Sequence, residues 1–206
     1  SVDKSRGRKV MRIAVLPEGG YEYSYYADDI VWGTRTGFHD LYKIAQSVFK
    51  TEEKVIVQQA IPLLRLRDRT VDFRAEVQRN GQGMLDIVGI CARIGQSHSP
   101  ITIHSDAVPF EQFWHELGGY SPTKTKRLRE NVDQFLYDVY RAIETYYGPF
   151  GEIGIDFGMD EHENIWFIEC NAKSAKVSLY KAYDEETVRR AFTNPLEYAR
   201  YLYLNR

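Results

Sequence analysis

Paired apolar runs around short polar turns constrain the fold of this chain more than any other feature. The segments 70–95 and 150–174 each contain two runs rich in β-branched and aromatic residues. The first two runs flank NGQG, in which Asn80-Gly81 is a strong hairpin signal because both residues tolerate positive φ. The second two runs flank the polar turn DEHEN. Both segments therefore predict antiparallel β-hairpins.

Apolar residues at helical spacing lie between and after these hairpins. The segment 121–148 is the longest helical pattern, with Ser121 at the N-cap position and Pro122 in the first turn. Because strands come in antiparallel pairs and helices are grouped, the predicted class is α+β. We expect further helices at 38–50, 109–119 and 184–203, the last broken near Asn194-Pro195, a turn with irregular or strand structure at 17–29, and strands at 10–17 and 54–61.

The composition is that of an ordinary globular protein. Hydrophobic residues make up 43% and charged residues 27% of 206 residues, and the formal net charge is −2. This balance gives no bulk attraction to nucleic acid or to an anionic membrane, and the apolar runs are too short to span a bilayer. Cys91 and Cys170 lie far apart without a zinc-binding pattern. A reducing, cytoplasmic compartment follows as the default expectation.

Three oxygen-bearing side chains in the second hairpin form the sharpest chemical signal. Glu169 and Asn171 share one face of their strand because side chains alternate, and the hairpin can bring Asp156 opposite Glu169. Two neighbouring carboxylates repel each other unless a cation lies between them. Oxygen ligands without His or Cys favour Mg²⁺ or Mn²⁺, and magnesium takes further ligands from phosphate. This pattern predicts a Mg·ATP site, and the alternative is a solvated hairpin with incidental acids.

The string GIDFGMDEHENIWFIECNAKS resembles the ATP-grasp pattern of an Asp-bearing strand, a turn and a strand ending in Glu-x-Asn. VIVQQAIPLL, TVDFRAEVQRNGQG, GICARIG and FGEIGIDFGMD resemble the endospore-coat-associated YheC/YheD-like branch of that superfamily. The resemblance runs from Val55 to Tyr180. Over residues 1–54, only SRGRKVMRIAV resembles a family feature, namely the end of a glycine-rich phosphate loop. It implies an ATP-grasp-like fold, with a partial small lobe at 1–60 and a large lobe with the metal site at 61–206.

The resemblance also implies roles for single residues. Asp156, Glu169 and Asn171 would hold magnesium, and Arg74 and Arg93 would face phosphate or an acyl phosphate through their planar forks. The alternatives are an ion pair of Arg74 with Asp72 or Glu76, and a surface strand charge for Arg93. The adenine pocket would be lined by the backbone of Gln58, Gln59 and Ala60 and by the side chains of Ile56 and Ile61. The implied reaction phosphorylates a small carboxylate with ATP, and an amine then attacks the acyl phosphate.

Departures from the family pattern leave the function open. The phosphate-binding lysine of the family is expected before Ser1, Gly154 occupies a position where many amino-acid ligases carry arginine, and NAKSAK replaces a frequent Pro-Gly. The segment 99–110 lacks the Thr-Asn and Gly-Gly features of the family. The leading hypothesis is an ATP-dependent carboxylate–amine ligase. The alternatives are a degenerate nucleotide-binding or structural protein linked to a spore coat, and an ATP-dependent kinase.

Overall fold

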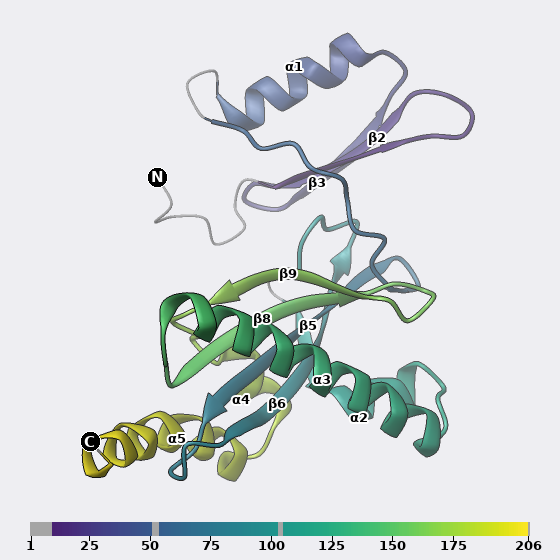
Figure 1. Cartoon of the computed structure of the whole chain (residues 1–206). Helices are drawn as coiled ribbons and strands as arrows, with labels where there is room; N and C mark the ends of the chain where they lie inside the picture. Colours follow the sequence, from purple (N-terminus) through teal and green to yellow (C-terminus); the bar gives the residue numbers. More distant parts are fainter. Residues whose placement is uncertain (1–9, 51–53, 103–104, 206) are drawn as a thin grey trace.

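The chain contains a small and a large antiparallel sheet, each flanked by helices (Figure 1). The computed structural model describes residues 10–50, 54–102 and 105–205. The expected end of a glycine-rich loop, SRGRKV at 5–10, lies outside these residues except for Val10. The segment after the first helix leads from the small sheet to the large sheet (Figure 1). This architecture confirms the predicted α+β class.

The small sheet has the order β1-β2-β3, formed by Met11–Val15, Tyr21–Tyr26 and Ile30–Arg35. Its first strand was predicted, whereas β3 was not. Helix α1, Phe38–Phe49, packs on the sheet at the predicted place and buries Leu41. Because Trp32, Phe38 and Tyr42 remain at least half exposed, this unit has a thin core.

The large sheet has the order β7-β6-β5-β8-β9, and a short strand β4 pairs with β5. Both predicted hairpins are confirmed, as β5–β6 and β8–β9, but β4 and β7 were not predicted. The strand bounds are Arg65–Leu66 for β4, Arg69–Arg79 for β5, Leu85–Ser97 for β6, Asp106–Pro109 for β7, Glu152–Met159 for β8 and Ile165–Asn171 for β9.

The turn between β5 and β6 uses different residues from those expected. Positive φ falls on Gly83, at 75°, rather than on Asn80 or Gly81. Asn80 instead acts through its side chain, which accepts hydrogen bonds from the backbone N–H groups of Gln82 and Met84. An asparagine that bonds the following backbone makes a turn without adopting the left-handed conformation itself.

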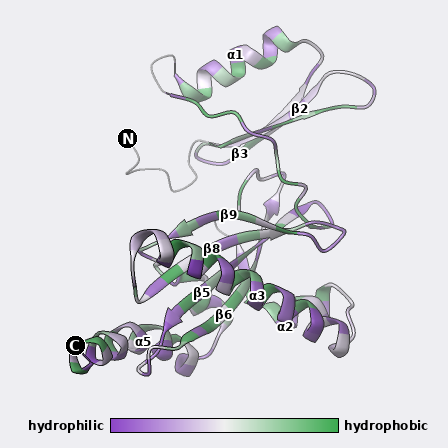
Figure 2. Ribbon diagram, in the orientation of Figure 1, coloured by the Kyte–Doolittle hydropathy of each residue, from purple (hydrophilic) through white to green (hydrophobic). Residues whose placement is uncertain are grey.

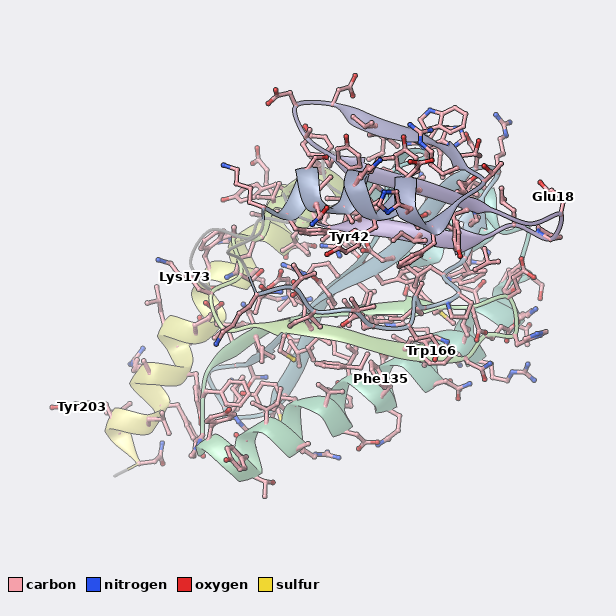
Figure 3. All side chains as sticks on the ribbon, turned by 90° about the horizontal axis from the view of Figure 1, so that it is seen from above. Glu18, Tyr42, Phe135, Trp166, Lys173 and Tyr203 are labelled. Atoms are coloured by element: carbon pink, nitrogen blue, oxygen red, sulfur yellow. The ribbon has the colours of Figure 1, made fainter. Side chains whose placement is uncertain are left out.

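Helix α3, Pro122–Tyr147, covers one face of the large sheet. It begins as predicted, with the Ser121 hydroxyl accepting from the Lys124 backbone N–H. Phe135 of this helix points toward the β8–β9 hairpin that carries Trp166 (Figure 3), and its ring lies 5.9 Å from Phe157. Hydrophobic residues concentrate along the strands, while α3 alternates in hydropathy as a half-buried helix does (Figure 2).

Shorter helices complete the large unit. The predicted helix at 109–119 is confirmed as α2, Phe110–Gln112, followed by a π-helical turn, Phe113–Leu117. Helices α4, Val177–Ala182, and α5, Glu185–Leu204, pack on the other face of the sheet, against β5, β6 and β7. No helix in the described ranges combines the length and apolar character needed to cross a membrane.

Two sequence predictions about secondary structure are wrong. The segment 54–61 forms no strand, and Ile56 and Val57 are 86% and 93% exposed. High β-propensity does not produce a strand where no neighbouring strand pairs with the backbone. Helix α5 continues through Pro195 instead of breaking there. The carbonyl of Ala191, which Pro195 cannot bond, accepts a hydrogen bond of 2.7 Å from the Gln78 side-chain amide.

Candidate functional site

Alternate residues of β5 give this strand one apolar and one polar face. Phe73, Ala75 and Val77 are fully buried on the side of α3. The intervening residues point to the opposite face, because successive strand side chains alternate. This polar face of β5 carries Asp72, Arg74, Glu76 and Gln78.

The hairpin register brings the predicted metal ligands together. Asp156 on β8 pairs with Glu169 on β9, and Gly154 pairs with Asn171. The Asn171 amide donates to the Glu169 carboxylate over 3.3 Å, so these two side chains share a face as expected. Glu169 is exposed and Asn171 is half-buried, whereas the Asp156 side chain is only 5% exposed.

The Asp156 carboxylate is held by two arginines. The Arg74 fork donates through Nε to Oδ1 and through Nη2 to Oδ2, the latter over 2.8 Å. Nη2 of Arg93 lies 3.4 Å from the same Oδ2. Both arginines are largely buried, and burial alone would lower the pKa of each. Their carboxylate partners outweigh that effect and raise both pKa values, so both guanidinium groups stay charged.

Arg93 is fixed more firmly than Arg74. Its Nε and Nη2 donate to the two oxygens of Asp72 over 2.6 and 2.8 Å. The Thr102 hydroxyl also donates to Asp72, over 2.8 Å. Arg93 is therefore no surface charge, and the partner of Arg74 is Asp156 rather than Asp72 or Glu76. The four charged groups alternate in sign across three strands, which compensates each charge that is removed from water.

A second polar group adjoins Arg74. The Ser174 hydroxyl donates to Oε1 of Glu76, and Nη1 of Arg74 lies 3.4 Å from the Ser174 oxygen. Glu76 is 1% exposed, and its Oε2 has no hydrogen-bond partner among the described residues. Burial raises the pKa of Glu76, although the Ser174 hydrogen bond and Arg74 oppose that rise. The sequence analysis treated Glu76 only as a possible partner of Arg74, and Ser174 only as a departure.

Gly154 makes room for these side chains. A Cβ at this position would lie 3.1 Å from the Ser174 side chain and 3.3 Å from Nη1 of Arg74. The arginine of β5 thus reaches into the space above Gly154. Lys176, a buried residue near this point, is paired with Glu152 over 2.7 Å.

The expected adenine-lining residues lie on the segment that enters the large sheet. Ile56, Gln58, Gln59 and Ala60 are exposed, and Ile61 is half-buried. The end of this segment is fixed, because the Leu64 N–H donates to the Met159 carbonyl over 2.7 Å.

An apolar surface borders the polar site where this segment ends. A Cβ at Gly158 would overlap Leu63 and lie 3.7 Å from Ile168, the residue before Glu169. Gly158 therefore lets Leu63 pack closely on the face of the sheet that carries Asp156. Ile168 was expected to be buried in its strand but is 37% exposed, and no role was predicted for Leu63.

Comparison with known proteins identifies the family. A family model described as YheC/D-like ATP-grasp matches residues 1–202. The chain belongs to this family. It is 26% identical over 168 residues to the endospore coat-associated protein YheC of Bacillus subtilis (strain 168), covering 77% of this chain and 45% of that protein. It is 24% identical over 165 residues to YheD of the same organism, covering 71% of this chain and 32% of that protein.

The chain of this ATP-grasp protein therefore spans less than half the length of either relative. Among solved structures, it is similar to N5-carboxyaminoimidazole ribonucleotide synthetase from Thermotoga maritima, at 12% identity and a TM-score of 0.35. That likeness covers 93% of this chain and 46% of the other. The resemblance inferred from the sequence motifs is confirmed by the family match.

Proposed function

We propose that this ATP-grasp protein binds ATP with Mg²⁺ or Mn²⁺ on the polar face of the large sheet. The bound nucleotide would phosphorylate a small carboxylate, and an amine would then attack the acyl phosphate. The predicted lobes, 1–60 and 61–206, would enclose the nucleotide between them. We further propose that the protein is cytoplasmic and that it can associate with the spore coat; the second part is supported by the names of YheC and YheD, which describe both as endospore coat-associated.

The pairing of Asp156 with Glu169 carries this proposal. It places two carboxylates on adjacent strands, and Asn171 bonds the outer one. The oxygens of the exposed Glu169 and the half-buried Asn171 suit a hard cation, whereas Asp156 is engaged by arginines. In the part of the chain that the structure describes, no three His, Cys, Asp or Glu side chains form a metal-binding group. The cation would therefore need Asn171, phosphate and water as further ligands, and would neutralise the phosphate charge.

The two arginines supply the remaining positive charge in this proposal. Among the described residues, Arg74 hydrogen-bonds only Asp156 and Ser174, and its charge lies beside the place proposed for the phosphates. Arg93 is fixed by Asp72 and contributes its charge beside Asp156. A bidentate guanidinium matches the geometry of phosphoryl oxygens. Ile56, Gln58, Gln59, Ala60 and Ile61 would close over the adenine, with Leu63 and Ile168 as an apolar floor.

The chemistry of the proposed reaction needs no nucleophile from the protein. A carboxylate oxygen attacks the γ-phosphorus of ATP, and ADP leaves. The amine nitrogen attacks the acyl carbon, and phosphate leaves with the bonding electrons while the amine loses a proton. The residues of this chain would align the reactants and compensate negative charge, which are the main contributions in phosphoryl transfer.

Calorimetric titration with ATP and magnesium tests the proposal. Glu169→Ala should abolish measurable binding, because it removes the exposed carboxylate. Glu161→Ala is the matched control, since Glu161 is an exposed acid in the turn of the same hairpin and should bind as the unchanged chain does. Equal binding by all three proteins would place the nucleotide elsewhere, and no binding by any of them would remove the proposed function.

A second candidate is a non-catalytic nucleotide-binding or structural protein of the spore coat. The observation that favours it is Asp156 itself, whose two oxygens are already bound by arginine. Phosphate release, measured over pools of carboxylates and amines, separates the two candidates. Release that depends on both substrates supports the ligase, and nucleotide binding without release supports the structural protein.

A further inference from the structure

Each oxygen of the Asp156 carboxylate faces a guanidinium nitrogen in the arrangement described above. Oδ1 accepts from Nε of Arg74, and Oδ2 lies against Nη2 of Arg74 and Nη2 of Arg93. A guanidinium and a divalent cation compete for the same carboxylate because each offers it positive charge. A metal that binds Asp156 therefore competes with an arginine for the carboxylate oxygens.

Arg74 is the arginine that can leave. Arg93 keeps two hydrogen bonds to Asp72, which Thr102 also holds. Within the described residues, Arg74 makes a comparable fork only with Asp156, and its one other side-chain hydrogen bond is the 3.4 Å approach to Ser174. Displacing Arg93 would leave Asp72 buried without its cation, which is costly.

Glu76 offers Arg74 a second position. It lies two residues farther along β5 and on the same face, and Ser174 connects it to Nη1 of Arg74. Its buried Oε2 has no partner among the described residues, although a buried acceptor is normally paired. An unpaired carboxylate oxygen next to a guanidinium costs free energy that a new ion pair would recover.

We propose that Arg74 and the divalent cation exchange with each other at the Asp156 carboxylate. Arg74 neutralises Asp156 when the cation is absent and moves to Glu76 when the cation takes the Asp156 carboxylate. This exchange rests on the proposed function, since it assigns the residues that control metal entry at the same site. It assigns a purpose to the unpaired oxygen of Glu76, and it avoids placing a divalent cation beside two arginines.

Manganese binding to the full chain without nucleotide, measured by electron paramagnetic resonance of free Mn²⁺, tests the exchange. Arg74→Met should tighten Mn²⁺ binding on the order of tenfold, because the Arg74 guanidinium no longer competes with the cation for Asp156. Glu76→Gln should weaken binding several-fold, because Arg74 then loses its second position. Glu76→Gln added to Arg74→Met should have no further effect.

Arg129→Met is the matched control. Arg129 is a partly buried arginine that binds Glu111 and Asp133 on the far side of the sheet. Its removal should leave Mn²⁺ affinity unchanged. If Arg74→Met binds Mn²⁺ no more tightly than the unchanged chain, the exchange is wrong, while loss of binding on Glu169→Ala would still support the metal site. If no variant binds Mn²⁺ with or without ATP, the exchange and the proposed function both fail.

A measurement on the unchanged chain guards against variants that do not fold. The ¹⁵N–¹H resonance of Arg74 Nε should shift on adding Mg²⁺, because this nitrogen loses its bond to Asp156, whereas that of Arg93 should move less. A resonance of Arg74 that stays in place while Mg²⁺ binds would overturn the exchange.

Discussion

The two faces of the paired strands β5 and β8 are stabilised by different interactions. On one face, the rings of Phe73 and Phe157 stack at 5.1 Å and pack against α3. On the other, the residues next to them in sequence, Arg74 and Asp156, form an ion pair. The apolar face is stabilised by burial that no ligand needs to complete. The polar face has groups that are still free to bind a ligand. They are the unpaired Oε2 of Glu76 and the exposed carboxylate of Glu169.

The apolar face should give the largest loss of stability. Phe73→Ala removes a fully buried ring that contacts four other aromatic rings. We expect the free energy of unfolding to fall by about 4 kcal/mol, measured by urea denaturation. Tyr146→Ala, at a side chain that is 81% exposed, should change it by less than about 0.5 kcal/mol. A similar loss for both variants would refute the assignment of the core.

The ion pair of Asp72 with Arg93 on the polar face should contribute almost as much to the free energy of unfolding. Asp72→Asn removes the negative charge that pairs with Arg93, so the charge of a buried guanidinium is poorly compensated. The expected loss in the free energy of unfolding is about 3 kcal/mol. Thr102→Val removes one hydrogen bond to Asp72 and should cost about 1 kcal/mol. Should Asp72→Asn cost less than Thr102→Val, Arg93 would not depend on Asp72 as described.

A smaller effect is expected at Gly154. Gly154→Ala puts a Cβ 3.1 Å from Ser174 and 3.3 Å from Arg74, so these side chains must shift. We expect a loss of about 1–2 kcal/mol in thermal or urea unfolding, together with weaker ATP binding. Gly37→Ala is the control, because a Cβ there has no neighbour within 4 Å. Equal stability of both variants would mean that Arg74 and Ser174 do not fill this space.

The smallest effect is a change in pH dependence at Glu76. Its pKa in the folded chain is raised above the ordinary 4.5 by burial. The folded state therefore holds this proton more tightly than the unfolded state, and Glu76 contributes stability that is full below pH 4.5 and is lost as the pH rises through the raised folded value.

Replacing the carboxyl group of Glu76 removes its contribution to the pH dependence of the free energy of unfolding. The stability of Glu76→Gln relative to the unchanged chain should rise as the pH increases from 4 toward neutrality, as measured by urea denaturation at a series of pH values. Glu130→Gln, at an exposed acid of α3, should run parallel to the unchanged chain. A parallel curve for Glu76→Gln would argue against a carboxyl group whose pKa is raised by burial.

Local patterns allowed much of this structure to be predicted from sequence. The alternation of β8 and β9 gave the pairing of Asp156 with Glu169, and Ser121 marked the start of α3. The partners of the two arginines were not predictable, because Arg74 meets Asp156 only where β5 lies beside β8, 82 residues later in sequence. The unbroken α5 likewise depends on Gln78, which is 113 residues from Ala191.

Where the sequence prediction failed, propensity was outweighed by context. The segment 54–61 has the composition of a strand, but its backbone has no neighbouring strand and Val57 stays exposed. Strand β3 was overlooked because it contains Gly33 and ends in the polar residues Thr34 and Arg35, and pairing with β2 stabilises it. The unpaired oxygen of Glu76 depends on side-chain packing that no periodicity encodes.

The most direct test of the central claim is a crystal of the chain with Mn²⁺ and a non-hydrolysable ATP analogue, examined by anomalous scattering at the manganese edge. A Mn²⁺ peak is expected at about 2.2 Å from oxygens of Asp156, Glu169 and Asn171, next to the phosphates and with Arg74 turned away from Asp156. A nucleotide bound without a metal peak between β8 and β9, or a metal elsewhere on the protein, would contradict the claim.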